Sequence, residues 1–416
     1  MSQKIKIFTI GDHPLSPSGV GTQTRYIIEG MLKTGKYQFV SFGGAIKHPN
    51  HKPQKLEEWG DDWVIWPVDS YGTQDMVRAM IHQQKPDILW FMTDPRFYGW
   101  LWQIENEVRP HVPMVYYHVW DNYPYPTFNS PLYRSNDHIA CISKLTYDIV
   151  QTVAPDIDCS YIPHAVKPNI FKPLEEEVVK GFKAQKGLTD KFVCFWNSRN
   201  ARRKQSGTLI WWFKEFLDKV GHDKATLIMH TDVKDPHGQD LEAIIHELGL
   251  TNGEILFSRE KIDPTSLAML YNMADVTINL SDAEGFGLSA LESLSSGTPV
   301  IVTMTGGLQD QVTDGKNWYG IGIEPASKAI IGSQQVPYIY EDRLNKNDFI
   351  VALEQMYEIG SDGRREWGLK CRDWVEKSFN FENFVEAWDE LFEKINTEKG
   401  SWDSRTGYTP YEVRTF

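Results

Sequence analysis

Cysteine is scarce in this sequence. Its 416 residues include only four cysteines. They are Cys141, Cys159, Cys194 and Cys371. No two of them have the Cys-x-x-Cys spacing of a structural zinc site, and they are too few and too scattered to indicate a disulfide framework. This usage is typical of a protein from a reducing compartment.

Long hydrophobic runs are also missing. No apolar segment approaches the roughly 20 residues that a membrane-spanning helix requires. Residues 4–10 alternate polar and apolar side chains, which is typical of a short strand and differs from the apolar core of a signal sequence. We therefore expect a cytoplasmic protein without an integral membrane segment, and peripheral membrane contact stays open.

An excess of positive charge is absent as well. The chain carries 43 Lys and Arg against 56 Asp and Glu, which gives a formal net charge of −13. Proteins that bind nucleic acid usually show a basic surface, so the balance disfavours nucleic acid and anionic membranes as partners. It does not exclude a local basic pocket.

Two common ligand-binding motifs are incomplete. Gly19 and Gly21 follow the first candidate strand, but the third glycine of a dinucleotide fingerprint is missing, which disfavours a Rossmann dehydrogenase. The chain has one Asp-x-Asp pair, Asp156 and Asp158, in a segment that we interpret as a solvated turn. There is also no His/Cys cluster of the kind that binds zinc. We expect no metal site and no cofactor.

Strand-like and helix-like segments alternate along the chain. Candidate strands lie at residues 5–10, 37–42, 63–66, 88–92, 114–118, 138–143, 192–197, 226–230, 254–257, 276–280 and 300–303. Helical patterns separate most of them, including 209–220 and a last helix at 381–396. Such alternation predicts parallel sheets with helices on both faces. The proline-rich segment 161–173 interrupts it, and the length favours two domains.

Cations cluster where one candidate strand ends. Residues 199–204 contain three arginines and a lysine directly after the strand at 192–197. Such a loop is by default a solvated surface. In an acidic chain, at the carboxyl end of a strand, it also fits a diphosphate clamp, since Arg binds phosphate oxygens as a fork and Lys as a point charge.

Two glutamates flank a glycine-rich turn near the C-terminal third. Glu284 follows the candidate strand at 276–280, and Glu292 lies eight positions later in a helical pattern. Between them stand Gly285, Phe286 and Gly287. Glycines allow close approach of the backbone to a ligand, and open α/β sheets bind ligands at the carboxyl ends of their strands.

Residues 281–300 resemble the Glu-x7-Glu signature of retaining, nucleotide-sugar-dependent glycosyltransferases of family 4, the group 1 type. Arg199 and Lys204 match the family's Arg and Lys five positions apart, although Gln205 replaces the usual glycine after the lysine. The segment 161–173 is similar to the family's interdomain segment, and 306–310 is similar to its G-G-x-x-E stretch, with Asp310 for Glu. Residues 320–342 depart from the pattern as an insertion.

The resemblance implies the α/β fold class named GT-B, in which two Rossmann-like domains face each other across a cleft. We expect an N-terminal, acceptor-side domain at 1–165 and a C-terminal, donor-side domain at 166–380. We expect the helix and tail at 381–416 to pack back on the N-terminal domain.

The resemblance also implies roles for individual residues. The first glutamate of the signature contacts the donor sugar, the amides after it contact sugar and phosphates, and the second glutamate binds the ribose. A histidine at the end of the strand at 114–118 reaches the donor sugar. The candidate catalytic residues are Glu284, His118, Arg199 and Lys204. The candidate donor-binding residues are Gly19 and Gly21 in the glycine-rich loop of the acceptor-side domain, with Gly285, Phe286, Gly287, Leu288 and Glu292. Asp121, Trp120 and Tyr123 are candidates for acceptor contact.

The activity implied is retaining transfer of a sugar from a nucleoside diphosphate sugar to an acceptor hydroxyl, without a metal. A saccharide-type acceptor is favoured because aromatic side chains around residues 91–102 and 116–128 suit sugar rings. Hydroxymethylated DNA is the main alternative, since residues 47–55 could form a local basic loop. Two further functions stay open, those of a nucleotide-sugar epimerase and of an inactive sugar-binding subunit.

Overall fold

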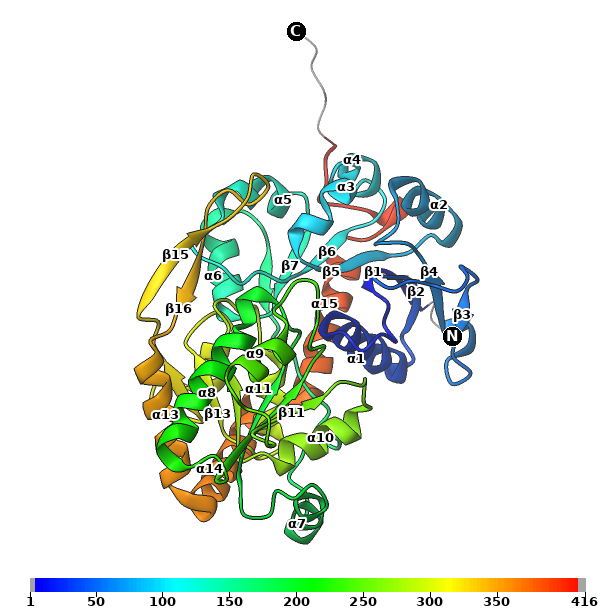
Figure 1. Cartoon of the computed structure of the whole chain (residues 1–416). Helices are drawn as coiled ribbons and strands as arrows, with labels where there is room; N and C mark the ends of the chain where they lie inside the picture. The colour runs from blue at the N-terminus through cyan, green and yellow to red at the C-terminus, as the bar shows by residue number, and fades with distance from the viewer. Residues whose placement is uncertain (1–3, 411–416) are drawn as a thin grey trace. The chain divides into compact units, whose positions relative to one another are not determined.

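Two parallel β-sheets organise the computed structural model, which describes residues 4–410 (Figure 1). The chain divides into two units. The first unit consists of the described residues within 1–120, 125–164 and 382–416, and the second of 121–124 and 165–381. The boundaries at 165/166 and 380/381 stay predictions about independent domains, and the part of the predicted tail at 411–416 lies outside the described residues.

The first unit contains an eight-stranded sheet with the order β3-β4-β2-β1-β5-β6-β7-β8. Only β3 pairs antiparallel to its neighbour. The strands are β1 Ile5–Asp12, β2 Tyr37–Gly44, β3 Gln54–Lys55, β4 Trp63–Pro67, β5 Ile88–Thr93, β6 Met114–His118, β7 His138–Cys141 and β8 Cys159–Tyr161. Strands β5 and β6 are buried along their whole length, as expected for central parallel strands covered on both faces.

The helices of the first unit connect these strands. They are α1 Gly19–Thr34, α2 Gln74–Gln84, α3 Gly99–Trp102, α4 Glu105–Val108, α5 Ser130–Arg134, α6 Lys144–Val153 and α15 Phe381–Glu398. Short 3-10 turns lie at Gly60–Asp62, Pro95–Phe97, Thr127–Asn129 and Trp402–Ser404. The predicted strand at 138–143 ends early because Ser143 caps α6, its side chain accepting a hydrogen bond from the Thr146 amide.

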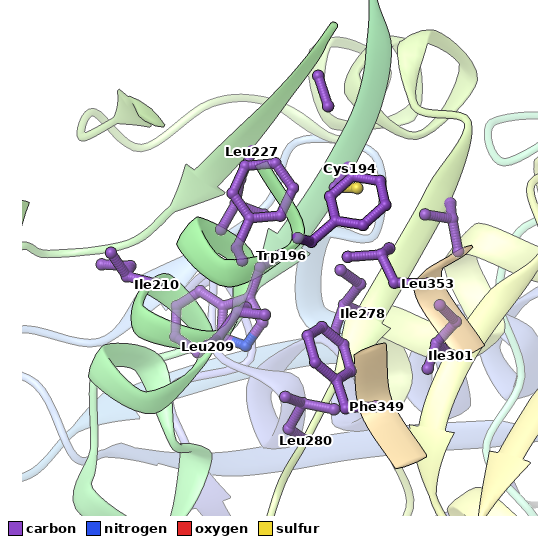
Figure 2. Close-up of a cluster of buried hydrophobic side chains, with 14 of the residues drawn as sticks. Cys194, Trp196, Leu209, Ile210, Leu227, Ile278, Leu280, Ile301, Phe349 and Leu353 are labelled. Carbon is purple, nitrogen blue, oxygen red and sulfur yellow. The ribbon is translucent and has the colours of Figure 1, made fainter. Parts of the chain in front are cut away.

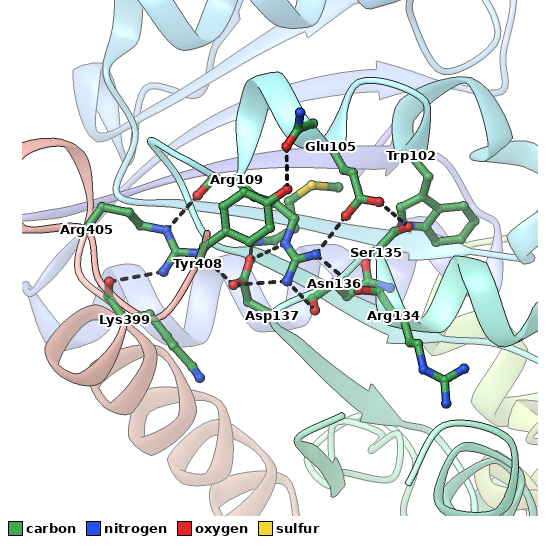
Figure 3. A network of polar contacts seen from close by, with 12 residues as sticks. Trp102, Glu105, Arg109, Arg134, Ser135, Asn136, Asp137, Lys399, Arg405 and Tyr408 are labelled. Atoms are coloured by element: carbon green, nitrogen blue, oxygen red, sulfur yellow. Dashed lines mark hydrogen bonds and ion pairs between the residues drawn. The ribbon is translucent and has the colours of Figure 1, made fainter. Parts of the chain in front are cut away.

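Helix α15 returns to the first unit from the far end of the chain. Its Trp388 packs edge-on against Trp90 of β5 and Tyr117 of β6, with ring centroids 5.9 Å and 4.8 Å apart. Beyond the helix, Arg405 pairs with Asp137 at 2.6 Å, and both side chains are buried (Figure 3). The described part of the C-terminal segment therefore belongs to the core of the first unit.

The second unit contains a six-stranded parallel sheet with the order β11-β10-β9-β12-β13-β14. Its strands are β9 Phe192–Asn197, β10 Ala225–His230, β11 Ile255–Ser258, β12 Val276–Asn279, β13 Val300–Thr303 and β14 Ile321–Ile323. Its helices are α7 Glu176–Gln185, α8 Ser206–Val220, α9 Leu241–Glu247, α10 Pro264–Met273, α11 Leu288–Ser295, α12 Leu308–Val312, α13 Lys346–Glu358 and α14 Gly360–Ser378. Arg202–Lys204 form a 3-10 turn.

The core of the second unit lies between this sheet and the helices α8 and α13. Trp196 of β9, Leu227 of β10 and Ile278 of β12 meet Leu209 of α8 and Phe349 of α13 (Figure 2). All five side chains are buried. The core fixes the strand ends from which the neighbouring loops emerge.

A hairpin occupies the segment that departs from the family pattern. Strands β15 Ser327–Ile331 and β16 Ile339–Arg343 pair antiparallel, with Ser327 opposite Arg343 and Ile331 opposite Ile339. The sequence pattern predicts no strand here, because a two-stranded ribbon buries one face only in part and leaves a weak hydrophobic pattern. The predicted main strands and the parallel α/β fold class are confirmed.

Candidate functional site

The strand order of the second sheet reverses between β9 and β12. The chain proceeds from β9 outward to β10 and β11, and then returns to place β12 on the other side of β9. Such a switch point in an open parallel sheet leaves a crevice at the carboxyl ends of the two strands. The loop 198–205 follows β9, and the loop 280–287 follows β12. Both sequence motifs therefore end at the same place.

Lys204 and Glu284 meet at this switch point. The Lys204 Nζ donates to Glu284 Oε2, and their side chains are only 10% and 13% exposed. Burial alone would raise the pKa of Glu284, but the charges of Lys204 and Arg203 outweigh it and hold that pKa below its ordinary value. The carboxylate is therefore ionised at neutral pH and held beside a cation.

Neighbouring polar groups orient the Glu284 carboxylate. The Ser281 Oγ lies 2.5 Å from Asn279 Oδ1 and 3.3 Å from Glu284 Oε2, and Asn279 Nδ2 lies 3.5 Å from the same oxygen. All of these contacts fall on Oε2, which also receives Lys204. A carboxylate can accept on both oxygens, so this arrangement fixes Glu284 through one oxygen and directs the other away from these partners.

Two glycines pack directly on the backbone of the Glu284 turn. A Cβ on Gly306 would lie 1.7 Å from the Glu284 carbonyl oxygen, and a Cβ on Gly307 would lie 2.5 Å from the Gly285 carbonyl oxygen. The Gly307 amide donates to the Glu284 carbonyl at 3.1 Å. Only glycine fits at either position, so the pair sets the path of the turn.

The turn then leads into helix α11. Gly287 has φ +92°, a left-handed conformation that favours glycine, and precedes Leu288, the first residue of the helix. Phe286 is buried against Phe379, and its carbonyl accepts from Gln311 Nε2 at 2.6 Å. The Phe286 side chain thus anchors the turn, which leaves the backbone of the glycine-rich segment to face a ligand.

Glu292 lies in the second turn of α11. Its Oε2 accepts from the Tyr271 hydroxyl at 2.7 Å, and that hydroxyl accepts from Asn197 Nδ2 at 2.8 Å. Burial raises the pKa of Glu292 to about 7, although the bond from Tyr271 opposes the shift. Asn197 ends β9, so this chain of contacts links Glu292 to the same strand end as the cationic loop.

The cations of the loop lie in different environments. Arg199 is largely exposed and pairs with Asp235 at 2.6 Å. Arg203 instead donates to the carbonyl of Ala283, next to Glu284, and lies 3.5 Å from Asp121. Arg203 is not among the residues that the sequence singles out. Its only signal is membership of the cationic stretch, because spacing favours Arg199.

The glycine-rich segment of the first unit differs from its prediction. Gly19 and Gly21 are expected in a loop before the first helix, but α1 begins at Gly19. Ser18 caps the helix by accepting from the Gly21 amide at 3.0 Å, and its hydroxyl donates to Asp12 at 2.6 Å. The cap starts the helix early, since a serine side chain can satisfy an otherwise unpaired amide.

His118 is fully buried within the first unit. Its Nε2 lies 2.8 Å from the Tyr133 hydroxyl, and burial lowers the pKa of the ring to about 3. Trp120 is buried beside Phe128. Asp121 and Tyr123 belong to the second unit, where Asp121 contacts Arg203 and the Tyr123 carbonyl accepts from the Tyr340 amide. The roles assigned to these residues stay predictions.

Metal-binding clusters and membrane-spanning helices are not found among the described residues. These residues contain no group of three or more His, Cys, Asp or Glu side chains placed to hold a metal ion. Within residues 4–410, no helix has both the length and the hydrophobicity to cross a bilayer.

Comparison with protein families matches one segment of the chain. The family described as Glycosyl transferases group 1 matches residues 181–348, which include both loops of the site. The chain is 27% identical over 190 residues to alpha-monoglucosyldiacylglycerol synthase of Streptococcus pneumoniae, covering 44% of this chain and 42% of that protein. It is 42% identical over 77 residues to D-inositol 3-phosphate glycosyltransferase of Corynebacterium urealyticum, covering 18% of each. The matches thus span less than half the length of these relatives.

Solved structures resemble the whole chain. Sucrose-phosphate synthase from Thermosynechococcus elongatus aligns with a TM-score of 0.74 and 16% identity, over 95% of this chain and all of that one. Anabaena HepE in complex with UDP-glucose aligns with a TM-score of 0.67 and 15% identity, over 94% of this chain and all of that one. The chain therefore has the GT-B fold, and with the match over residues 181–348 this supports a glycosyltransferase of group 1.

Proposed function

We propose that this chain is a retaining, family 4 type glycosyltransferase that moves a sugar from a nucleoside diphosphate sugar to an acceptor hydroxyl. One observation carries the proposal. Lys204 and Glu284, from two loops far apart in the sequence, meet in a mostly buried ion pair at the switch point of the second sheet. The acceptor that we favour is saccharide-like, and the four free cysteines fit a cytoplasmic site of action.

The cations have a direct chemical use in this reaction. When the bond between the anomeric carbon and the phosphate oxygen breaks, negative charge develops on the leaving diphosphate. Arg203 and Lys204 lie together at the site, and Arg199 is exposed at the start of the same loop. Fixed cations that need no rearrangement stabilise such charge effectively.

The two glutamates would hold the two ends of the donor. Glu284 carries a negative charge and can accept hydrogen bonds from sugar hydroxyls, and Glu292 can accept from the ribose once it is ionised. In the retaining step, the acceptor oxygen bonds to the anomeric carbon on the face that the diphosphate leaves. The acceptor proton passes to the departing phosphate oxygen. No carboxylate of the chain is assigned as a covalent nucleophile.

A donor screen tests the proposal. Sugar conjugates of UDP, GDP and ADP are added singly, and the melting temperature is recorded, because a ligand that binds the folded state raises it. The donor that binds is then supplied in labelled form with a panel of saccharide acceptors. The expected result is label in a glycoside with retained configuration. No shift with any donor, or release of free sugar without transfer to any acceptor, contradicts the proposal.

We also expect transfer without added divalent metal. The reason is the Arg and Lys cluster, which can supply the positive charge that a metal–diphosphate complex would otherwise provide. Activity is measured before and after EDTA treatment followed by desalting. Activity that EDTA abolishes and Mg²⁺ or Mn²⁺ restores shows that the cations are insufficient.

A further inference from the structure

The β15–β16 hairpin makes its polar contacts with the loops of the candidate site (Figure 1). A two-stranded ribbon is marginally stable by itself, so its contacts with the rest of the second unit decide where it lies. Those contacts involve three consecutive residues of β16, Glu341, Asp342 and Arg343, together with the backbone of Tyr340.

The first contact joins the hairpin to the cationic loop. Glu341 is 4% exposed and receives both guanidinium ends of Arg202, with distances of 2.8 Å and 2.6 Å. This two-pronged geometry fixes direction as well as distance. Arg202 begins the 3-10 turn that ends at Lys204. A buried carboxylate of the hairpin therefore holds the start of the turn that carries the site lysine.

The second contact joins the hairpin to both loops at once. Asp282, which is buried, receives Arg343 Nη1 at 2.8 Å and Gln205 Nε2 at 2.7 Å. Its amide donates to the Arg203 carbonyl at 2.8 Å. Its carbonyl accepts from the Asp342 amide at 2.8 Å. Residues on both sides of Arg203 and Lys204 are thus tied to the hairpin.

A third contact fixes the hairpin at another point. The Tyr340 amide donates to the Tyr123 carbonyl, and the Tyr340 carbonyl accepts from Asn122 Nδ2 at 2.6 Å. Asp121, in the same short segment, lies 3.5 Å from Arg203. The segment 121–124 and the cationic loop are therefore both in contact with one strand of the hairpin or with each other.

We propose that the hairpin is a positioning element for diphosphate binding, and that Glu341 is its central residue. Glu341 orients Arg202 and so holds the 202–205 turn with Arg203 and Lys204 directed at the diphosphate of the donor. The inference rests on the proposed function, since it assigns the diphosphate as the ligand. Glu341 itself lies behind the loop and acts through Arg202.

The test measures binding with Glu341→Gln, which keeps the shape of the side chain and removes its charge. Titration calorimetry is run with UDP, GDP and ADP, and the nucleotide that binds the unaltered protein is then compared with its nucleoside. We expect affinity for the diphosphate to fall about tenfold, because a charge-assisted contact is replaced by a neutral one. Affinity for the nucleoside, which lacks phosphates, should stay unchanged.

Two further variants sharpen the test. Glu341→Asp keeps the charge and should recover part of the lost affinity. Glu354→Gln removes a surface carboxylate of α13 that pairs with Lys219, and it should bind like the unaltered protein. Should Glu341→Gln fail to fold, Arg343→Met is measured instead, since Arg343 is 29% exposed and contacts both Asp282 and Glu341.

The outcomes separate this inference from the proposed function. A folded Glu341→Gln protein that binds the diphosphate as tightly as before overturns the positioning role and leaves the transferase proposal standing. Equal losses for nucleoside and diphosphate also overturn it, since they indicate general damage to the fold. If the unaltered protein binds none of the three diphosphates, both proposals fail.

Discussion

At the scale of single residues, the Lys204–Glu284 pair requires an explanation. Taking two charges out of water is costly, and a buried pair often adds little net stability. Both side chains are nearly buried, and Ser281 and Asn279 supply further contacts on the same carboxylate oxygen. Such an arrangement keeps a charged carboxylate and a cation in fixed positions before any ligand arrives, which is the condition for electrostatic preorganisation.

Removing one partner of this pair should harm both stability and binding. Lys204→Met leaves Glu284 buried without its cation, and we expect the free energy of unfolding to fall by about 3–5 kcal/mol. Denaturant titration measures the loss, and donor binding is followed separately. In the double variant Lys204→Met/Glu284→Gln much of the stability should return, because no buried charge is left unpaired, while donor binding stays impaired. Recovery of binding together with stability would contradict the assignment.

Glu292 should make the protein sensitive to pH. Its pKa is raised from an ordinary 4.5 to about 7, so the folded state favours the protonated form. The resulting stabilisation is complete below about pH 4.5 and is lost as the pH rises through 7, and it amounts to something on the order of 2 kcal/mol. Denaturation of the unaltered protein and of Glu292→Gln between pH 4.5 and 8 measures it. The difference between the two should shrink or reverse as the pH rises, and a constant difference would refute the shift.

The sequence predicts individual residues only in part. Glu284, Glu292 and Lys204 can be selected because glycine, strand and helix signals around them are local in the sequence. Arg203 cannot, because its position depends on the 3-10 turn at Arg202–Lys204, which rotates adjacent side chains in different directions. Arg199, chosen by spacing, instead pairs with Asp235 from the loop after β10. Such contacts between distant segments leave no pattern in the sequence.

At the scale of secondary-structure elements, the site depends on a close contact between two turns. The Gly306–Gly307 segment at the start of α12 lies against the backbone of the turn before α11. This explains why a glycine pair stands far along the chain from Glu284. The sequence shows the pair as part of a family pattern, and its physical reason is visible only when the two turns meet.

A methyl group at this contact should disturb the site. In Gly306→Ala, the new Cβ would lie 1.7 Å from the Glu284 carbonyl oxygen, so the turn must move. We expect a loss of about 1–3 kcal/mol of stability, together with reduced donor binding. The matched control is Gly181→Ala in α7, where a Cβ meets nothing within 4 Å. That variant should be unchanged or more stable by roughly 0.5–1 kcal/mol. Equal thermal stability of both variants would rule out the contact.

Elements differ in how well their sequences predict them. The main strands are long apolar runs bounded by polar loops, and this pattern is local. The short β3 and β8 and the β15–β16 hairpin escape prediction, since each has few residues or mixed polarity. The predicted start of α1 is too late because its pattern does not reveal the cap by Ser18. The insertion is recognisable as a departure, but nothing in its sequence indicates contacts with the cationic loop.

At the scale of the whole molecule, the two ends of the described chain belong to the same unit. Strand β1 lies in the middle of the first sheet, while α15 and the residues after it return from the second unit. The aromatic content of the tail predicts packing, and Trp402 does pack there, its ring nitrogen donating to the Pro86 carbonyl at 3.0 Å. The cluster of Arg109, Asp137 and Arg405 cannot be predicted, because its members lie far apart in the sequence.

The C-terminal segment should therefore stabilise the first unit without affecting donor binding. Arg405 and Asp137 form an ion pair with 3% and 2% exposed side chains, and Arg109 also contacts Asp137. Arg405→Met breaks one of these contacts, and we expect a loss of about 3 kcal/mol. The control Arg134→Met removes an exposed ion pair with Asp156 in the same unit and should cost at most about 1 kcal/mol.

Donor binding supplies the second readout for Arg405→Met. The residues assigned to the nucleotide lie in the second unit, so nucleotide affinity measured by calorimetry below the melting temperature should equal that of the unaltered protein. Stability and binding would then respond to different parts of the chain. Lower affinity in the folded Arg405→Met protein, with normal affinity in Arg134→Met, would instead show that the first unit takes part in holding the donor nucleotide.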